Sequence, residues 1–371
     1  MIKWFLFGLA LVFVTVLGLP PGSTDAAYHF ANFKGKPPIH QFGSASNKPS
    51  GLSPSQIKAA YNLPTSGGHG TIAIIGAYND TTIEHDLGVF STQYNLPACT
   101  TANKCLEIHS LGSTYNSGWS METSLDVEWS HAIAPSAKIL LVEAKTPSGA
   151  NLIAAVDYAR SRSDVVAVSM SWGGAEFSDE TTLDSHFTSS GGKITFFASS
   201  GDNGTGASWP AASPNVVAVG GTHINFSSRK LTSETAWSGS GGGVSAYEKE
   251  PSYQADYNIS QANGHRAIPD VSYNADPSSG FSVYRSTQKS TKNGWYVFGG
   301  TSAGAPQWAA IKSLGLSADN GKFYTDKASA SNGQYFRDIT TGSNGSCGFY
   351  CSARKHYDYV TGLGSPLTSK F

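Results

Sequence analysis

The fold is decided by a short apolar run, Thr71-Ile72-Ala73-Ile74-Ile75-Gly76. A strand with apolar side chains on both of its faces is typical of a parallel sheet that helices cover on each side. Further runs of this kind alternate with helical patterns at residues 121–132, 151–160 and 180–187. The sequence thus predicts an α/β fold with a parallel sheet and helices on both faces, and its 371 residues allow one large domain or two. The further runs are residues 138–143, 165–170, 194–198 and 216–219.

A second stretch directs attention to one serine. It reads Tyr296-Val297-Phe298-Gly299-Gly300-Thr301-Ser302-Ala303-Gly304-Ala305-Pro306-Gln307-Trp308-Ala309-Ala310. The glycines permit a close backbone approach, and a serine at a helix start lies beside free N–H groups, which suits a nucleophile that forms an oxyanion. The alternative is that Ser302 only caps the helix. Since ligands in open sheets bind beyond the carboxyl ends of strands, the turns after Met170 and Ala198 are expected at the same site.

The composition limits the classes of function. Charged residues make up only 14% of the 371 residues and the formal net charge is -1, so a nucleic-acid or polyanion partner is not indicated. A surface with few ionised carboxylates suits a protein that works in acid. The expected partners therefore do not include a nucleic acid.

The N-terminus predicts export. One early lysine, Lys3, precedes an uncharged apolar run at residues 4–19, followed by Pro20-Pro21-Gly22 and small residues. This is the pattern of a secretory signal peptide at residues 1–26, and the run is shorter than the roughly 20 residues that span a bilayer. Residues 27–50 then form a short polar leader or arm without a clear period, and residues 51–371 form the folded domain. The mature protein is expected to be secreted and extracellular.

Export changes how the four cysteines are interpreted. Cys99 lies close to Cys105, and Cys347 lies close to Cys351, so two local disulfides are the favoured pairing of the three that are possible. A zinc site is the rival interpretation, but the spacing lacks the paired CxxC pattern.

A histidine is the first candidate for a base that activates Ser302. Gly300-Thr301-Ser302 is similar to the serine segment of subtilisins, which carry their catalytic histidine in His-Gly-Thr, and this chain contains His69-Gly70-Thr71. Here the histidine precedes a strand, whereas the subtilisin pattern needs it to begin a helix. The strand also ends in Gly76, where a subtilisin has Asp. His69 is therefore interpreted as a turn residue.

A carboxylate is the better candidate. Glu122 and Asp126 are four residues apart in a helical pattern, so they share one face of the helix, while Glu128 points away. Two like charges at that spacing repel unless they share a proton, which raises one pKa and suits acid–base chemistry in acid. The alternative is a solvated acidic helix face, but this pair is flanked by apolar residues. The apolar residues are Leu125, Val127, Trp129, Ala132 and Ile133.

A third acid follows the predicted strand at residues 194–198. Asp202 stands in Ser199-Ser200-Gly201-Asp202-Asn203-Gly204. A protonated carboxyl can donate a hydrogen bond to a developing oxyanion, so Asp202 suits that task at low pH. The alternative is an ordinary Asp-Asn-Gly turn.

Together these segments resemble the sedolisins, the serine-carboxyl peptidases that include tripeptidyl peptidase I and have a subtilisin-like fold in which Glu replaces the catalytic His. The resemblance runs from about residue 52 to residue 366, and it implies a single catalytic domain. It rests on the family's order of five pieces, none of which is decisive alone. They are the Glu122/Asp126 helix ending in Ala134-Pro135, Ser171-Trp172-Gly173, the Asp202 turn, Pro269-Asp270-Val271-Ser272 and Gly300-Thr301-Ser302.

The resemblance implies a catalytic role for four residues. Ser302 would be the nucleophile and Glu122 its general base and then acid, while Asp126 holds and polarises Glu122. Protonated Asp202 would donate to the oxyanion together with the Ser302 backbone N–H. The implied reaction is peptide-bond cleavage through an acyl-enzyme, active in acid, as an endopeptidase or a tripeptidyl-peptidase. The expected partner is then a protein or peptide substrate, with no membrane after removal of the signal peptide, and the chain is expected to be a monomer.

The C-terminal segment, at about residues 336–366, resembles the family's calcium site. The resemblance implies one structural Ca²⁺ held by the carboxylates of Asp338 and Asp358 and by backbone carbonyls of Ile339, Arg354 and His356. The family usually has glycines at the positions of Arg354 and His356. Only their carbonyls would be needed, yet positive side chains beside a cation depart from the pattern. Two ordinary turn aspartates are the alternative.

Two other functions stay open at this point. One is a secreted binding protein of the same fold without catalysis, although all four catalytic positions are present. The other is a His69-dependent subtilisin-type protease. Family members commonly have a long folded propeptide, whereas only the short leader stands before this domain, so its role is an open question.

Overall fold

The computed structural model describes residues 29–227, 230–286, 293–316, 318–327 and 335–367. The predicted signal peptide lies outside these residues. Among the described residues no helix is long and apolar enough to span a bilayer.

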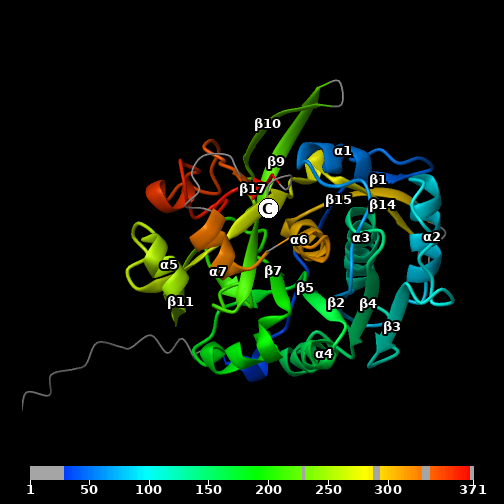
Figure 1. The fold of residues 1–371 in the computed structure, drawn as a ribbon, viewed down its shortest axis with the longest axis horizontal. Helices are drawn as coiled ribbons and strands as arrows, with labels where there is room; N and C mark the ends of the chain where they lie inside the picture. The colour runs from blue at the N-terminus through cyan, green and yellow to red at the C-terminus, as the bar shows by residue number, and fades with distance from the viewer. Residues whose placement is uncertain (1–28, 228–229, 287–292, 317, 328–334, 368–371) are drawn as a thin grey trace, which may run out of the picture.

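The prediction of an α/β fold with a mostly parallel central sheet is confirmed (Figure 1). The sheet has the strand order β10-β9-β7-β5-β2-β4-β3, and β13 pairs with β9. Every pairing is parallel except that of β10 with β9. Its strands are β2 (Thr71–Ala77), β3 (Leu106–Ser110), β4 (Lys138–Ala144), β5 (Val165–Met170), β7 (Thr195–Ser199), β9 (Val216–Ser227), β10 (Lys230–Ala236) and β13 (Val271–Asn274).

Helices cover both faces of this sheet, as the apolar strands predict. The alternation along β2 shows how: Ile72 and Ile74 belong to one buried apolar cluster, and Ala73 and Ile75 belong to another. Helices α3 and α6 contribute to the first cluster and α4 to the second, and Figure 1 shows α4 apart from the other two. The helices are α1 (Pro54–Ala60), α2 (Ile83–Gln93), α3 (Ser117–Ile133), α4 (Gly149–Ser161), α5 (Ser252–Tyr257), α6 (Gly304–Ser313) and α7 (Asn320–Lys322).

Local capping fixes where the long helices begin. The Asn116 side chain accepts hydrogen bonds from the N–H groups of Gly118 and Trp119 at 3.0 and 3.1 Å, which satisfies two donors at the start of α3.

The helical pattern at residues 180–187 forms a 3-10 helix, Glu180–Phe187, rather than an α-helix. The Glu180 carboxylate there accepts from the Phe177 N–H at 2.8 Å, which ties the segment to a tight turn.

A second, three-stranded sheet carries the chain to Ser302. Strand β1 (His40–Ser46) pairs with β15 (Gly294–Gly299), which pairs on its other side with β14 (Phe281–Arg285). Part of the leader, residues 27–50, is therefore an edge strand of this sheet. The described residues also form three two-stranded sheets. They are β6 (Gly174–Ala175) with β8 (Ser208–Trp209), β11 (Gly243–Lys249) with β12 (His265–Ile268), and β16 (Phe336–Arg337) with β17 (Ser365–Pro366).

Both predicted disulfides are present. Cys99 is bonded to Cys105 with their Cα atoms 4.9 Å apart, and Cys347 is bonded to Cys351 with their Cα atoms 5.3 Å apart. No free cysteine is left, so the zinc interpretation of these residues is wrong.

Candidate active site

Ser302 lies at the junction between β15 and α6. The chain leaves β15 through Gly300, whose φ of 119° is open to glycine but strained for other residues, and enters a short 3-10 turn, Thr301–Ala303, before α6. A Cβ atom at position 300 would lie 2.1 Å from the Pro38 carbonyl oxygen and 2.5 Å from Asp202 Oδ2. Only glycine therefore lets these groups approach the backbone next to Ser302, which is itself fully buried.

Glu122 faces this serine from α3. Its side chain is only 2% exposed, and within the described residues neither carboxyl oxygen makes a well-formed hydrogen bond; the same holds for Ser302 Oγ. Burial and then the neighbouring Asp126 raise the pKa of Glu122 well above its usual range, while the Ser302 hydroxyl opposes the rise. The hydroxyl thus lies close enough to stabilise the charged carboxylate, and such hydrogen bonds often tighten only when substrate binds.

Asp126 stands one helical turn from Glu122 and is held from the other side. Ser171 Oγ, in the turn after β5, lies 2.8 Å from Asp126 Oδ1 and 3.2 Å from the Ser302 carbonyl oxygen. Burial raises the pKa of Asp126 to about 8, although Ser171 and Glu122 act to lower it. The two carboxyls therefore hold at least one proton between them across the acid range, and Ser171 links their helix to the nucleophile.

Asp202 follows β7 and lies against the residue before the nucleophile. Its Oδ1 accepts hydrogen bonds from the Thr301 N–H at 2.8 Å and from the Thr301 hydroxyl at 2.7 Å. Nε2 of His40, at the start of β1, lies 3.2 Å from Oδ2. Burial raises the pKa of Asp202, opposed by the contacts of His40 and Thr301. The pKa of His40 is raised in turn by its hydrogen bond to Asp202.

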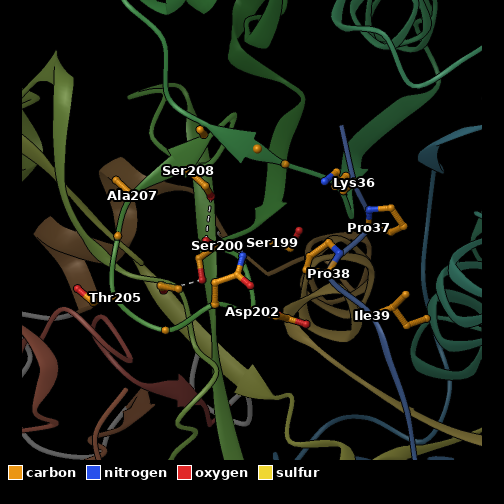
Figure 2. Close-up of a pocket in the computed structure, with 18 of the residues that line it drawn as sticks. Lys36, Pro37, Pro38, Ile39, Ser199, Ser200, Asp202, Thr205, Ala207 and Ser208 are labelled. Carbon is orange, nitrogen blue, oxygen red and sulfur yellow. Dashed lines mark hydrogen bonds between the residues drawn. The ribbon is translucent and has the colours of Figure 1, made fainter. Parts of the chain in front are cut away.

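A cavity of about 650 Å³ opens beside Asp202 (Figure 2). Its walls come from the turns after β5 and β7, where the sequence places ligand binding, and from the leader. Figure 2 shows Pro37 and Pro38 of the leader facing Asp202 and Ser200 across this space. The lining includes Gly173, Gly174 and Ala175, residues 199–208, Gly241, and Lys34 together with residues 36–40.

His69 lies far from this site. Its backbone N–H donates to the Ser313 carbonyl at 2.9 Å, and Ser313 ends the helix that begins next to Ser302. A ten-residue helix such as α6 is about 15 Å long, so His69 stands at the opposite end of α6 from Ser302. The structure thus separates His69 from the nucleophile, and it is exposed in a turn as the sequence indicates.

The five residues of the predicted calcium site gather in one loop cluster. The Arg354 N–H donates to Asp358 Oδ2 and the His356 N–H donates to Asp338 Oδ2, each at 3.1 Å. Asp338 Oδ1 is buried and, within the described part of the chain, has no hydrogen-bonding partner. Burial raises the pKa of Asp338 and brings that of Asp358 to about 6. An unpartnered carboxylate oxygen is a hard donor of the kind that Ca²⁺ prefers, so the two aspartates fit the ion.

Sequence reasoning missed His40, Ser171 as a link between base and nucleophile, and the Thr301 contacts of Asp202. Ser171 had a signal, because it opens Ser171-Trp172-Gly173 in the turn after a buried strand. His40 had none, because it stands in a polar stretch without a period and reaches Asp202 only through the pairing of β1 with β15.

Comparisons with known proteins agree with this geometry. A model of the subtilase family matches residues 53–332. Kumamolisin from Bacillus sp. (strain MN-32) is 31% identical over 305 residues, which are 72% of this chain and 52% of that protein. Sedolisin from Pseudomonas sp. (strain 101) is 30% identical over 239 residues, which are 54% of this chain and 39% of that protein. The chain thus spans about half or less of these curated relatives.

Solved structures give the same result. A Pseudomonas sedolisin, a serine-carboxyl proteinase complexed with two molecules of pseudo-iodotyrostatin, superposes with a TM-score of 0.73 at 26% identity, covering 87% of this chain and 97% of that one. Sphericase, with a TM-score of 0.54 at 19% identity over 88% of this chain and 100% of that one, shares the fold. The chain belongs to the subtilase family. Its resemblance to the sedolisins, inferred from the sequence, is confirmed.

Proposed function

We propose that this chain is a secreted, acid-active serine-carboxyl peptidase, an endopeptidase or tripeptidyl-peptidase that cleaves peptide bonds through an acyl-enzyme on Ser302. The observation that carries the proposal is the buried Glu122 carboxyl, which faces Ser302 and is backed by Asp126. A buried carboxyl without a partner is costly to keep unless it has a task. The serine-carboxyl proteinase with the same fold supports this reading.

The first half of the reaction uses the groups in the order of their contacts. Ser302 Oγ attacks the carbonyl carbon of the substrate while Glu122 takes the hydroxyl proton. The oxyanion is stabilised by the Ser302 backbone N–H and by protonated Asp202, which Thr301 holds in place. The C–N bond then breaks, and Glu122 returns the proton to the leaving amine.

The second half repeats these steps with water. Glu122 deprotonates a water molecule that attacks the acyl-enzyme, and the carboxylic acid product leaves as Ser302 regains its proton. Asp126 keeps Glu122 oriented and shares its proton, as the third member of a triad does. His69 takes no part, since it stands at the far end of α6.

Acid activity follows from the direction of the pKa shifts. Asp202 can donate to the oxyanion only while protonated, and its pKa is raised, so the donor is present in acid and is lost as pH rises through that pKa. The Glu122/Asp126 pair likewise needs a shared proton. Activity is therefore expected to decline towards neutral pH.

Two further parts of the proposal concern the setting of the enzyme. Secretion is supported by the sequence pattern of residues 1–26 and by the two disulfides, which persist in oxidising compartments. One structural Ca²⁺ is proposed in the C-terminal loop cluster. Asp338 and Asp358 would contribute carboxylates, and Ile339, Arg354 and His356 would contribute backbone carbonyls. The ion would neutralise the half-buried carboxylate of Asp338 and the buried carboxylate of Asp358, and it would hold this loop cluster together.

Digestion of a peptide library from pH 2 to pH 8, with mass-spectrometric mapping of the cuts, tests the function. We expect cleavage in acid by the wild-type protein and none by Ser302→Ala. The spacing of the cuts from the peptide N-terminus separates the tripeptidyl from the endopeptidase activity. Cleavage that peaks at neutral pH, or that persists in Ser302→Ala, would contradict the proposal.

A further inference from the structure

Ser171 stands where the two carboxyls of α3 meet the nucleophile. It directly follows β5 and is only 1% exposed. Its hydroxyl oxygen lies 2.8 Å from Asp126 Oδ1 and 3.2 Å from the Ser302 carbonyl oxygen. Both neighbours accept hydrogen bonds, and a serine hydroxyl has one proton to donate. Ser171 can therefore donate a well-aligned bond to Asp126 or to Ser302, but not to both at once.

The charge of Asp126 decides between these two acceptors. A carboxylate accepts a shorter and stronger hydrogen bond than a neutral carbonyl does, so ionised Asp126 takes the Ser171 proton. A protonated Asp126 carboxyl loses this advantage, and it can itself donate to Ser171 Oγ. Ser171 then has its own proton free for the Ser302 carbonyl. The direction of this hydroxyl thus follows the protonation of the Glu122/Asp126 pair.

The Ser302 carbonyl needs such a donor because of the residue four positions later. In an α-helix a carbonyl accepts from the N–H four residues on, and position 306 is a proline, which has no N–H. Helix α6 begins two residues after Ser302, so this bond cannot form at its start. The Ser171 hydroxyl offers a donor in its place.

The pair is electrostatically simple among the described residues. Glu122 and Asp126 act on each other, and the titratable group that acts on Glu122 from another element is Asp202, in the turn after β7. The charged groups on the other elements packed against α3 have different partners. Asp80 after β2 and Arg285 of β14 contact Ser120, Asp86 of α2 acts on Glu128, Lys58 of α1 acts on His131, Glu143 of β4 accepts from Asn79, and Lys312 of α6 faces Asp319.

We propose that Ser171 is a positioning residue that stabilises the singly ionised Glu122/Asp126 pair and so sets the lowest pH at which Glu122 can act as a base. The proposal rests on the proposed function, in which Glu122 must be a carboxylate to accept the Ser302 proton. When Glu122 takes that proton the pair becomes neutral, and Ser171 donates to the Ser302 carbonyl instead. The return of the proton to the leaving amine restores the charge on the pair and the bond to Asp126.

The direction of the pKa shifts agrees with this role. Burial raises the pKa of Asp126 to about 8, and Ser171 is the first of the groups that oppose the rise. Without Ser171 the pair would hold both protons to higher pH, so Glu122 would become a carboxylate only nearer to neutrality. Asp202 is by then losing the proton that it donates to the oxyanion, so the pH range of activity would become narrower.

The pH dependence of kcat/KM tests the proposal, because its acid limb reports the first ionisation of the pair in the free enzyme. Ser171→Ala should move this limb upwards by about one to two pH units, the size expected when a hydrogen bond to a charged group is lost. Ser171→Thr keeps the hydroxyl and should restore the wild-type limb. An unmoved limb in Ser171→Ala would overturn the proposal, whatever the loss of kcat.

Ser130→Ala is the matched control. Ser130 is fully buried, and its hydroxyl donates to the Pro306 carbonyl of α6 at 3.3 Å. Like Ser171→Ala, this variant loses a buried hydroxyl bonded to the chain at the start of α6, but it loses no bond to a carboxyl. Its kcat should fall by less than about tenfold with the acid limb unmoved. An equal shift of the limb in Ser130→Ala would show that looser packing moves the pKa, and would refute the role of Ser171.

A second measurement does not depend on catalysis. Ser302→Ala, with and without Ser171→Ala, can be titrated by infrared spectroscopy of its protonated carboxyls, and the signal of the pair is the part that a further Asp126→Asn change removes. We expect the first proton of the pair to leave at higher pH when Ser171 is absent. Peptide hydrolysis by the wild type together with equal titrations would overturn the Ser171 proposal and leave the peptidase standing. A shifted titration with no hydrolysis at any pH would support the link to Asp126 and defeat the proposed function.

Discussion

Glu122 and Glu128 lie on the same helix and are buried to the same degree, with 2% and 0% of their surfaces exposed, yet their surroundings differ. Burial raises the pKa of both carboxyls well above the usual range. Glu128 accepts a hydrogen bond from the Tyr284 N–H at 3.0 Å and thereby fastens β14 to α3. Glu122 has no such partner and faces Ser302. Burial and a raised pKa therefore do not separate a structural carboxyl from a reactive one, whereas the hydrogen-bonding partner does.

The strongest test of this comparison exchanges each acid for its amide. Glu122→Gln removes the base and should lower kcat by about 10²–10⁴-fold or more near pH 4, approaching Ser302→Ala. Glu128→Gln keeps an oxygen that accepts from the Tyr284 N–H, so kcat should stay within about twofold of wild type. Peptide hydrolysis by both variants, with circular dichroism as the control for folding, measures the contrast. Equal losses in the two variants would show that burial alone accounts for the Glu122 effect.

A smaller effect is expected at the oxyanion. Asp202→Ala removes a donor and should cost about 10²–10³ in kcat. Asp202→Asn keeps an N–H donor at every pH, so its remaining activity should no longer fall as pH rises through the pKa of Asp202. Full pH profiles of kcat for the three proteins check this. A profile of Asp202→Asn that matches the wild type would place the pH dependence elsewhere, in the Glu122/Asp126 pair.

The buried carboxyls of Asp126 and Glu128 should both make the thermal stability of the protein depend on pH. Asp126, with a pKa near 8, and Glu128 bind protons more tightly in the folded chain than in the unfolded chain, where a carboxyl titrates at about 4. Their contribution is therefore complete below that value and is lost as pH rises through the folded pKa, at about 1.4 kcal/mol per pKa unit. We expect Tm in Ser302→Ala, which cannot digest itself, to fall between pH 4 and pH 8. Glu128→Gln should flatten that fall, and a Tm that rises over this range would contradict the sign.

Asp338 differs from both, because it is half-buried and its one buried oxygen has no partner among the described residues, so a cation would satisfy it. Adding a chelator near pH 6 should lower Tm by about 5 °C or more, because an ion present at a hundredfold excess over its Kd stabilises by about 2.7 kcal/mol. Asp338→Asn should abolish the response while keeping the fold. Unchanged melting with and without chelator would leave Asp338 as an ordinary turn residue.

The sequence predicted the parts of the fold whose residues are apolar in a regular pattern. The strands around Ile74 and Val168 are buried on both faces, so their composition alone identifies them. The sheet of β1, β14 and β15 was not predicted, because β1 is mostly exposed and mixes polar residues with glycine. Its position is set by pairing with β15, a contact that spans most of the chain.

The candidate site divides in the same way. Glu122 and Asp126 were found because helical spacing places them together, and the turns after Met170 and Ala198 because parallel strands end at one edge. The contact of His40 with Asp202 and the path of the leader past Gly173 depend on main-chain hydrogen bonds, which any residue except proline can form. Such contacts leave no signal in side-chain composition, so the leader was expected only as a surface arm.

The distance of His69 from Ser302 also has a practical use. The turn that holds His69 is exposed and stands at the end of α6 away from the cleft, and the chain has no free thiol. A single cysteine introduced at the exposed Ser66 would give one attachment point for a solid support. Protein immobilised there would present its cleft to the solution, so that surface-bound molecules could neither digest one another nor block their own substrate.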